Sequence, residues 1–187
     1  MKMFTRGTLP RSLIFAVAML VSAGTSAMAG DSFSDDRSKI EQLEARYLFA
    51  MDFRDADAYA ETFAKDGVLT WAGGVIKGRE AIRKFMREQH SSAGFGDTKQ
   101  TPGDHPPAAR HFLTNLVVKI NGNHAKSVAY WFELGDNNPE RKPELGAYGH
   151  FENELVKENG EWYFQTRTIF NEQLKARAAM GRPNPAH

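Results

Sequence analysis

The sequence contains no cysteine in its 187 residues. Without thiols the chain can form no disulfide framework, and it has no thiolate to act as a nucleophile or a metal ligand. Side-chain packing alone must therefore hold the fold together, and cysteine-based catalysis is excluded.

Clustered positive charge is also missing. The 24 Lys and Arg residues are balanced by 23 Asp and Glu residues, and the two signs are interleaved along the chain after residue 30. A protein that binds nucleic acid needs a basic patch facing the phosphates. We therefore expect no nucleic-acid partner.

A long hydrophobic run is absent as well. The apolar run at 13–21 falls well short of the roughly 20 residues that a membrane span needs. It follows Lys2, Arg6 and Arg11 and precedes small residues that end in Ala27-Met28-Ala29, a pattern typical of a secretory signal peptide. We expect cleavage after residue 29, export to the periplasm or the exterior, and no membrane attachment afterwards. The alternative is a retained N-terminal anchor helix.

Cleavage would leave 187 − 29 = 158 residues, which fit one domain with a substantial core. We expect a polar leading segment at 30–38, a single domain at 39–175 and a flexible tail at 176–187. No internal repeat is visible in the sequence.

The first half of the domain is predicted to be mainly helical. Apolar side chains recur at helical spacing at positions 40, 43, 47, 48 and 51, and Asp55 is placed to cap the helix that follows. The expected elements are helices at 36–54, at 56–63 with a stop at Asp66-Gly67, and at 81–90, and a hairpin of strands 68–71 and 75–77 around Gly73-Gly74.

The second half is predicted to be a loop followed by a β-meander. Residues 91–110 carry glycines and prolines without periodicity, so this segment is either a lid over a pocket or a disordered insertion. Strands are expected at 110–120, 125–134, 145–157 and 162–170, with tight turns at 121–123 and 158–160, a polar excursion at 136–143 and a short helix at 171–180.

Helices followed by a meander predict an α+β domain. Three N-terminal helices would pack on one face of a strongly curved, mainly antiparallel sheet, which leaves a cone-shaped space. Whether side chains fill this cone or leave a cavity decides between a structural and a functional interpretation.

Several residues along this order of elements resemble those of a known group. They are Tyr47 and Asp52, the segments 63–67 (FAKDG) and 78–82 (GREAI), His111 with Asn115, and Gly160-Glu161-Trp162 followed by Arg167. Over residues 40–171 the chain resembles the SnoaL-like polyketide cyclase/dehydratase branch of the nuclear transport factor 2-like superfamily.

The resemblance implies a pocket protein for a small apolar or aromatic ligand. Relatives include dehydratases, steroid isomerases and polyketide cyclases that use Tyr, Asp, His and sometimes Arg without a metal or organic cofactor. The Tyr-x-Asp found on the third long strand of relatives is replaced here by Phe151-Glu152-Asn153. The resemblance also implies a homo-oligomer, either a dimer through the outer sheet face or a trimer.

Four candidate catalytic residues come from this comparison, and each has an ordinary structural alternative. Asp52 lies at the edge of the apolar stripe of its helix, and it is either a general base or a capping or ion-paired carboxylate. Tyr47 lies at the centre of the stripe, and it is either a core residue or a hydrogen-bond donor to an oxyanion. His111 is a general acid or base, or a hydrogen-bonded core residue.

The fourth candidate, Arg167, is predicted to share a strand face with Tyr163 and Gln165, opposite Trp162 and Phe164. It is either an anchor for a substrate oxygen or an orienting partner of Asp52, or an ordinary surface arginine.

Further residues are predicted to line the pocket, although each could equally be core or surface. The candidate substrate contacts are Trp71, Asn115, Trp131, His150 and Phe151. A metal site built from Asp104, His105 and His111 is not expected, because the sequence offers no compact motif with a third ligand in workable geometry.

The sequence thus favours a cofactor-independent lyase or isomerase. Asp52 and His111 would exchange protons during elimination from a hydroxylated cyclic or aromatic substrate, while Tyr47 and Arg167 hold oxygens. The alternatives are a periplasmic binding or carrier protein without catalysis, and a protein-interaction module whose cone is filled by side chains.

Overall fold

The computed structural model describes residues 32–92, 109–136, 138–174 and 183–187. All of them belong to the unit Asp31–His187. The predicted signal peptide, most of the loop predicted at 91–110 and most of the helix predicted at 171–180 lie outside the described residues. The end of this segment that is described, residues 171–174, is not helical.

The three helices form where the apolar spacing predicts them. Helix α1 (Phe33–Asp52) begins at a capping box in which Ser32 and Asp35 exchange side-chain and backbone hydrogen bonds. Helix α2 (Ala56–Glu61) begins at Asp55, whose carboxylate accepts from the backbone N–H of Ala58. Helix α3 is Arg79–Ser92.

The predicted end of α2 at Asp66-Gly67 is wrong, because strand β1 (Phe63–Trp71) already begins two residues after the helix. The backbone of Phe164 donates to the carbonyl of Thr62 at 2.9 Å, and Phe63 pairs with Phe164. A Cβ at Gly67 would lie 2.8 Å from the Phe164 carbonyl oxygen. Pairing with a distant strand therefore overrides the local tendency to continue the helix.

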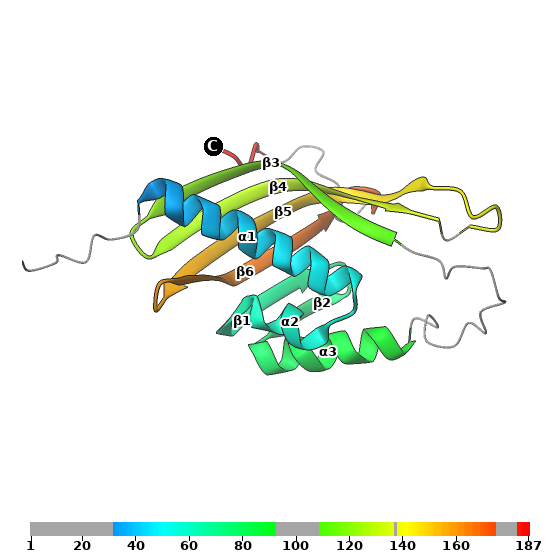
Figure 1. Ribbon diagram of the computed structural model, residues 1–187, viewed down its shortest axis with the longest axis horizontal. Helices are drawn as coiled ribbons and strands as arrows, with labels where there is room; N and C mark the ends of the chain where they lie inside the picture. The colour runs from blue at the N-terminus through cyan, green and yellow to red at the C-terminus, as the bar shows by residue number, and fades with distance from the viewer. Residues whose placement is uncertain (1–31, 93–108, 137, 175–182) are drawn as a thin grey trace, which may run out of the picture. The chain divides into compact units, whose positions relative to one another are not determined.

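The remaining strands complete one sheet among the described residues (Figure 1). They are β2 (Gly74–Lys77), β3 (Ala109–Asn121), β4 (His124–Gly135), β5 (Glu144–Glu158) and β6 (Glu161–Asn171). The strand order is β2-β1-β6-β5-β4-β3, so β3 is an edge strand. The pair β1–β6 is parallel, and the other pairs of described strands are antiparallel.

Turn chemistry sets the hairpin registers as predicted. Asn121 pairs with His124 around Gly122, which has φ +58°. Glu158 pairs with Glu161 around Asn159 and Gly160, both of which also have positive φ, as two-residue hairpin turns require.

Helix α1 lies across one face of the curved sheet, and α2 and α3 pack near β1 and β2 (Figure 1). The core between these layers is formed by fully buried side chains, among them Ile40, Leu43, Tyr47, Phe151, Trp162 and Phe164. This is the predicted α+β architecture. No helix in the described part of the chain is long and apolar enough to span a membrane.

The predicted face of Arg167 is wrong because β6 contains an extra residue. Glu154 pairs with Thr166, but its neighbour Leu155 pairs with Phe164, which leaves Gln165 unmatched. Such a bulge reverses the alternation of side chains beyond it. Arg167 therefore points to the same buried side as Phe164 and is fully inaccessible to solvent.

Candidate active site

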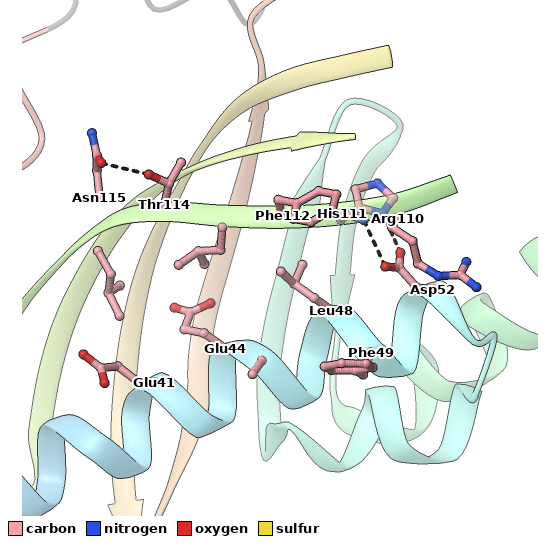
Figure 2. A pocket seen from close by; sticks show the side chains of 13 residues that line it. Glu41, Glu44, Leu48, Phe49, Asp52, Arg110, His111, Phe112, Thr114 and Asn115 are labelled. Carbon is pink, nitrogen blue, oxygen red and sulfur yellow. Dashed lines mark hydrogen bonds and ion pairs between the residues drawn. The ribbon is translucent and has the colours of Figure 1, made fainter. Parts of the chain in front are cut away.

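A pocket of about 580 Å³ lies between α1 and the edge strand β3 (Figure 2). This volume suits a small-molecule ligand. From α1 it is lined by Glu41, Glu44, Ala45, Leu48, Phe49 and Asp52, and from β3 by residues 110–116. Most of its wall is apolar, and the carboxylates and His111 stand out against it.

Asp52 and His111 form the clearest chemical pair in this pocket (Figure 2). Oδ1 of Asp52 lies 2.6 Å from Nδ1 of His111, and Oδ2 accepts from the His111 backbone N–H at 2.9 Å. The Asp52 side chain is only 6% exposed. One carboxylate thus fixes both the backbone and the ring of the histidine.

This geometry determines which ring nitrogen is free for chemistry. An ionised carboxylate only accepts hydrogen bonds, so Nδ1 must carry a proton to bond Asp52. Nε2 is then the nitrogen that can gain or lose a proton, the arrangement by which a buried Asp orients a histidine general base.

A second carboxylate approaches the same imidazole from β4. Oε2 of Glu133 lies 3.7 Å from Nε2 of His111, and the two residues are cross-strand partners. Gly146 of β5 leaves the room for this side chain, since a Cβ there would lie 3.2 Å from Oε1 of Glu133. His111 is therefore set between two carboxylates.

The sequence prediction missed Glu133 because of a bulge in β3. The register set by the turn at Asn121–His124 would place Leu134 opposite His111, but two β3 residues, Asn115 and Leu116, face one residue of β4. Asn115 has φ +56° at this point. The shift of one residue exchanges a leucine for a glutamate beside the histidine.

Glu44 was also missed, although it lines the pocket two helical turns before Asp52. It is 2% exposed. Arg167 donates to Oε2 at 2.8 Å, and Ser127 and Asn153 donate to Oε1 at 3.2 and 3.0 Å. A glutamate on the apolar stripe of a predicted helix is the sequence signal that could have identified it, since buried charges are paired.

Arg167 lies behind Glu44 in the core. Its guanidinium carbon is 3.8 Å from the ring centre of Tyr47 and 3.7 Å from that of Phe151, so both rings make cation–π contacts with it. Two of its nitrogens, Nε and Nη2, are buried and have no hydrogen-bond acceptor. Burial disfavours its charge, but Glu44 together with Tyr47 and Tyr59 outweighs this effect, so the pKa of Arg167 is raised.

Tyr47 is in the core too, and it does not line this pocket. Its hydroxyl lies 2.7 Å from that of Tyr59. Burial raises the pKa of Tyr47 and raises that of Tyr59 well above its ordinary value. The structure therefore splits the predicted catalytic set into two pairs, Asp52 with His111 in the pocket and Tyr47 with Arg167 in the core.

Two residues predicted to line the pocket, Trp131 and Phe151, lie in the core, where Trp131 is next to His111 and Phe151 is next to Trp131. Trp131 lies 6.0 Å from the His111 ring and stacks on Phe151 at 5.8 Å. Its indole N–H donates to the Phe170 carbonyl. Both aromatic side chains are buried in the core rather than lining this pocket.

The other predicted contacts lie elsewhere. Trp71 packs against Phe85 of α3. Asn115 is at the pocket's edge, and its side chain points away from α1 (Figure 2). His150 belongs to a separate pocket of about 420 Å³, where its ring lies between Glu152 and Glu172 and stacks on Phe170 at 4.5 Å.

Metal ligation has no candidate in the part of the chain that the structure describes. No group of three or more His, Asp or Glu side chains there has the arrangement that would hold an ion.

A curved sheet covered by helices, with a pocket between the first helix and the edge strand, defines the nuclear transport factor 2-like, or cystatin-like, fold, described for solved structures similar to this chain. The chain belongs to the SnoaL-like domain family, which matches residues 32–168. The resemblance predicted from the sequence is confirmed. The family includes polyketide cyclases and dehydratases. No curated protein matches the sequence.

Three solved structures illustrate the similarity. ActVI-ORFA from Streptomyces coelicolor is 18% identical over 74% of this chain and 98% of its own, with a TM-score of 0.60. A scytalone dehydratase-like protein from Novosphingobium aromaticivorans is 18% identical over 80% and 95%, with a TM-score of 0.60. A Catenulispora acidiphila protein, solved in complex with S-DNPA, is 22% identical over 75% and 96%, with a TM-score of 0.61.

Proposed function

We propose that this protein is a cofactor-independent lyase or isomerase, most concretely a dehydratase of a hydroxylated cyclic or aromatic compound. The observation that carries the proposal is the Asp52–His111 pair, with Nδ1 bound to a buried carboxylate. The apolar wall contributed by Leu48, Phe49 and Leu113 favours a mainly apolar ring system as the ligand.

In the proposed reaction His111 carries the proton and Asp52 is a positioning residue. Nε2 takes a proton from a carbon next to the one that bears the hydroxyl, and the C–H electron pair becomes the new double bond. The C–O bond breaks, and the imidazolium returns the proton to the departing oxygen as water. Because one group takes and returns the proton, no external acid or oxidant is needed.

Glu133 and Asp52 would stabilise the imidazolium that forms between these two steps. Opposite charges at such short distances attract each other. Tyr47 and Arg167 would act indirectly in this scheme, since Arg167 contacts Glu44, Tyr47 contacts Arg167, and neither lines the pocket.

The direct test is conversion of a copurifying or library compound by the purified protein, followed by mass spectrometry for loss of water. Wild type, Asp52→Asn and His111→Gln are compared, with Glu158→Gln as a control at an exposed residue outside the pocket wall. We expect His111→Gln to abolish turnover and the control to retain it. Full turnover by a folded His111→Gln variant would refute the assignment.

A carrier function is the alternative, favoured by the predicted signal peptide. In that case native mass spectrometry of protein from its own compartment would show a bound compound that stays unchanged after prolonged incubation. A transformed compound would support the enzyme.

We also propose that the protein is exported and cleaved after residue 29, as the sequence pattern predicts. Mass measurement of the mature N-terminus and fractionation of the producing cells test this. An uncleaved N-terminus in the membrane fraction would instead identify the segment as an anchor.

Self-association through the outer sheet face is a further proposal. This face, opposite α1, carries the row Phe112, Phe132 and Tyr148 across β3, β4 and β5, and Phe112 and Phe132 stack at 5.1 Å. Both Phe112 and Tyr148 are exposed in the isolated chain. Light scattering should give a mass of two or three chains, and Tyr148→Glu should lower it.

A further inference from the structure

The pocket has two polar positions separated by an apolar stretch. Glu44 and Asp52 both line it from α1 and are eight residues apart, which at about 1.5 Å per residue corresponds to about 12 Å along the helix. The apolar side chains of the wall include Leu48 from α1 and Leu113 and Leu116 from β3. Figure 2 shows the Glu44 carboxylate facing the space below β3 and Asp52 at the other end.

The carboxylate of Glu44 retains one place for a further donor. An ionised carboxylate has about four acceptor positions, and three are taken by Arg167, Ser127 and Asn153. Two of these donors bond Oε1, so the open position is on Oε2, which accepts from Arg167 alone. The three bonds also hold the group rigidly, so no ordering is needed when a ligand binds.

The sign of the charge at this end selects the ligand group. Arg167 is fully buried behind Glu44 and is not part of the pocket wall. The wall itself presents Glu44 and, one turn earlier, the exposed Glu41. A hydroxyl can donate to this end, whereas a carboxylate would meet like charge and only acceptors.

We propose that Glu44 is a second ligand-binding position, which recognises a hydroxyl at the far end of an elongated, rigid apolar ligand whose other hydroxyl reaches His111. This proposal rests on the proposed function in one respect only, namely which end of the ligand reacts. It defines the substrate class as a compound of fused or linked rings with hydroxyl groups at both ends.

Binding of three probes with the same two-ring body tests this on the wild-type protein. The probes are 4-hydroxybiphenyl, 4,4′-dihydroxybiphenyl and 4′-hydroxybiphenyl-4-carboxylate, and their Kd values are measured by calorimetry. We expect the dihydroxy probe to bind about tenfold more tightly than the monohydroxy probe, because a hydrogen bond to a charged acceptor exceeds a neutral one. The carboxylate should bind most weakly.

Variants then assign the preference to Glu44. The double variant Glu44→Met with Arg167→Met removes both charges, so neither is left buried alone. It should bind the two hydroxylated probes within about twofold of each other. The control Glu158→Gln, at an exposed residue outside the pocket wall, should keep the wild-type preference.

The proposal is overturned if wild type shows no preference for the second hydroxyl, if the carboxylate binds best, or if a folded double variant keeps the preference. Should the double variant fail to fold, the wild-type series alone decides. Binding without turnover would count against the proposed reaction and leave the Glu44 position standing, so the two failures are distinguishable.

Discussion

Replacing Asp52 with asparagine separates the two roles of its carboxylate, because the side chain keeps its shape and loses its charge. In the wild type both oxygens accept hydrogen bonds, one from the backbone and one from the ring of His111. Asparagine has one oxygen and one NH2 group, so it can accept only one of these bonds. If the backbone bond persists, the NH2 group faces Nδ1, which must then give up its proton.

The expected cost follows from these contacts. A charge-assisted hydrogen bond contributes about 1.5–3 kcal/mol and a neutral one about 0.5–1.5 kcal/mol. Weakening two such bonds around a side chain that is 6% exposed should therefore lower the free energy of unfolding by about 2 kcal/mol. For a domain of this size that corresponds to a fall in Tm of roughly 4–8 °C.

Two assays that need no substrate check this prediction. Urea unfolding measures the stability change, and nitrogen-15 NMR of the imidazole reports which ring nitrogen is protonated. In the wild type Nδ1 should carry the proton, whereas in Asp52→Asn the neutral ring should carry it on Nε2 and turnover should fall by about 10⁴-fold. A wild-type ring with an unprotonated Nδ1, or a variant that keeps Nδ1–H, would refute the proposed mechanism.

Three other predictions have defined outcomes. Gly149→Ala should lower the free energy of unfolding by about 3 kcal/mol or more, measured in urea, because its Cβ would overlap the Phe170 backbone carbonyl. Gly146→Ala meets a movable carboxylate at 3.2 Å and should cost less; equal costs would contradict this. Glu133→Gln should lower kcat by about tenfold or more with Kd unchanged, and an unchanged kcat would remove Glu133 from the mechanism. The pKa values of Tyr47 and Tyr59 are raised in the folded state. The stability that these two hydroxyls contribute is therefore complete below about pH 10 and is lost as the pH rises through their pKa values in the folded protein. Tyr47→Phe should lower stability at neutral pH by about 1 kcal/mol and reduce the alkaline loss; an identical slope above about pH 10 would contradict it.

The sequence predicts the layers of this fold well, because those depend on local patterns. Helical spacing located α1 to within three residues at each end, and Asn-Gly chemistry fixed the β5–β6 hairpin. The Asp52–His111 pair was named from the sequence together with the family resemblance. Its hydrogen bonds could not be derived, since the two residues lie 59 positions apart in the chain.

The face of Arg167 and the partner of His111 could not be predicted, because each depends on one extra residue in a strand. The extra residue at Gln165 reverses the face of Arg167 and moves it from a presumed pocket contact into the core. The extra residue near Asn115 exchanges Leu134 for Glu133 beside His111. Neither bulge changes the hydrophobic pattern enough to be seen in advance, because both are set by how distant strands pair.

The β3 bulge affects how this chain is aligned with sequences whose strand is shorter. Deleting one residue at Asn115 would remove the extra residue and let the hairpin pair without interruption from its turn, with Glu133 still opposite His111. The helices, the strand order and the core would need no substitution. A strand one residue shorter would therefore present the same two side chains, and an alignment with a sequence that lacks the extra residue needs a gap at Asn115 to keep His111 opposite Glu133.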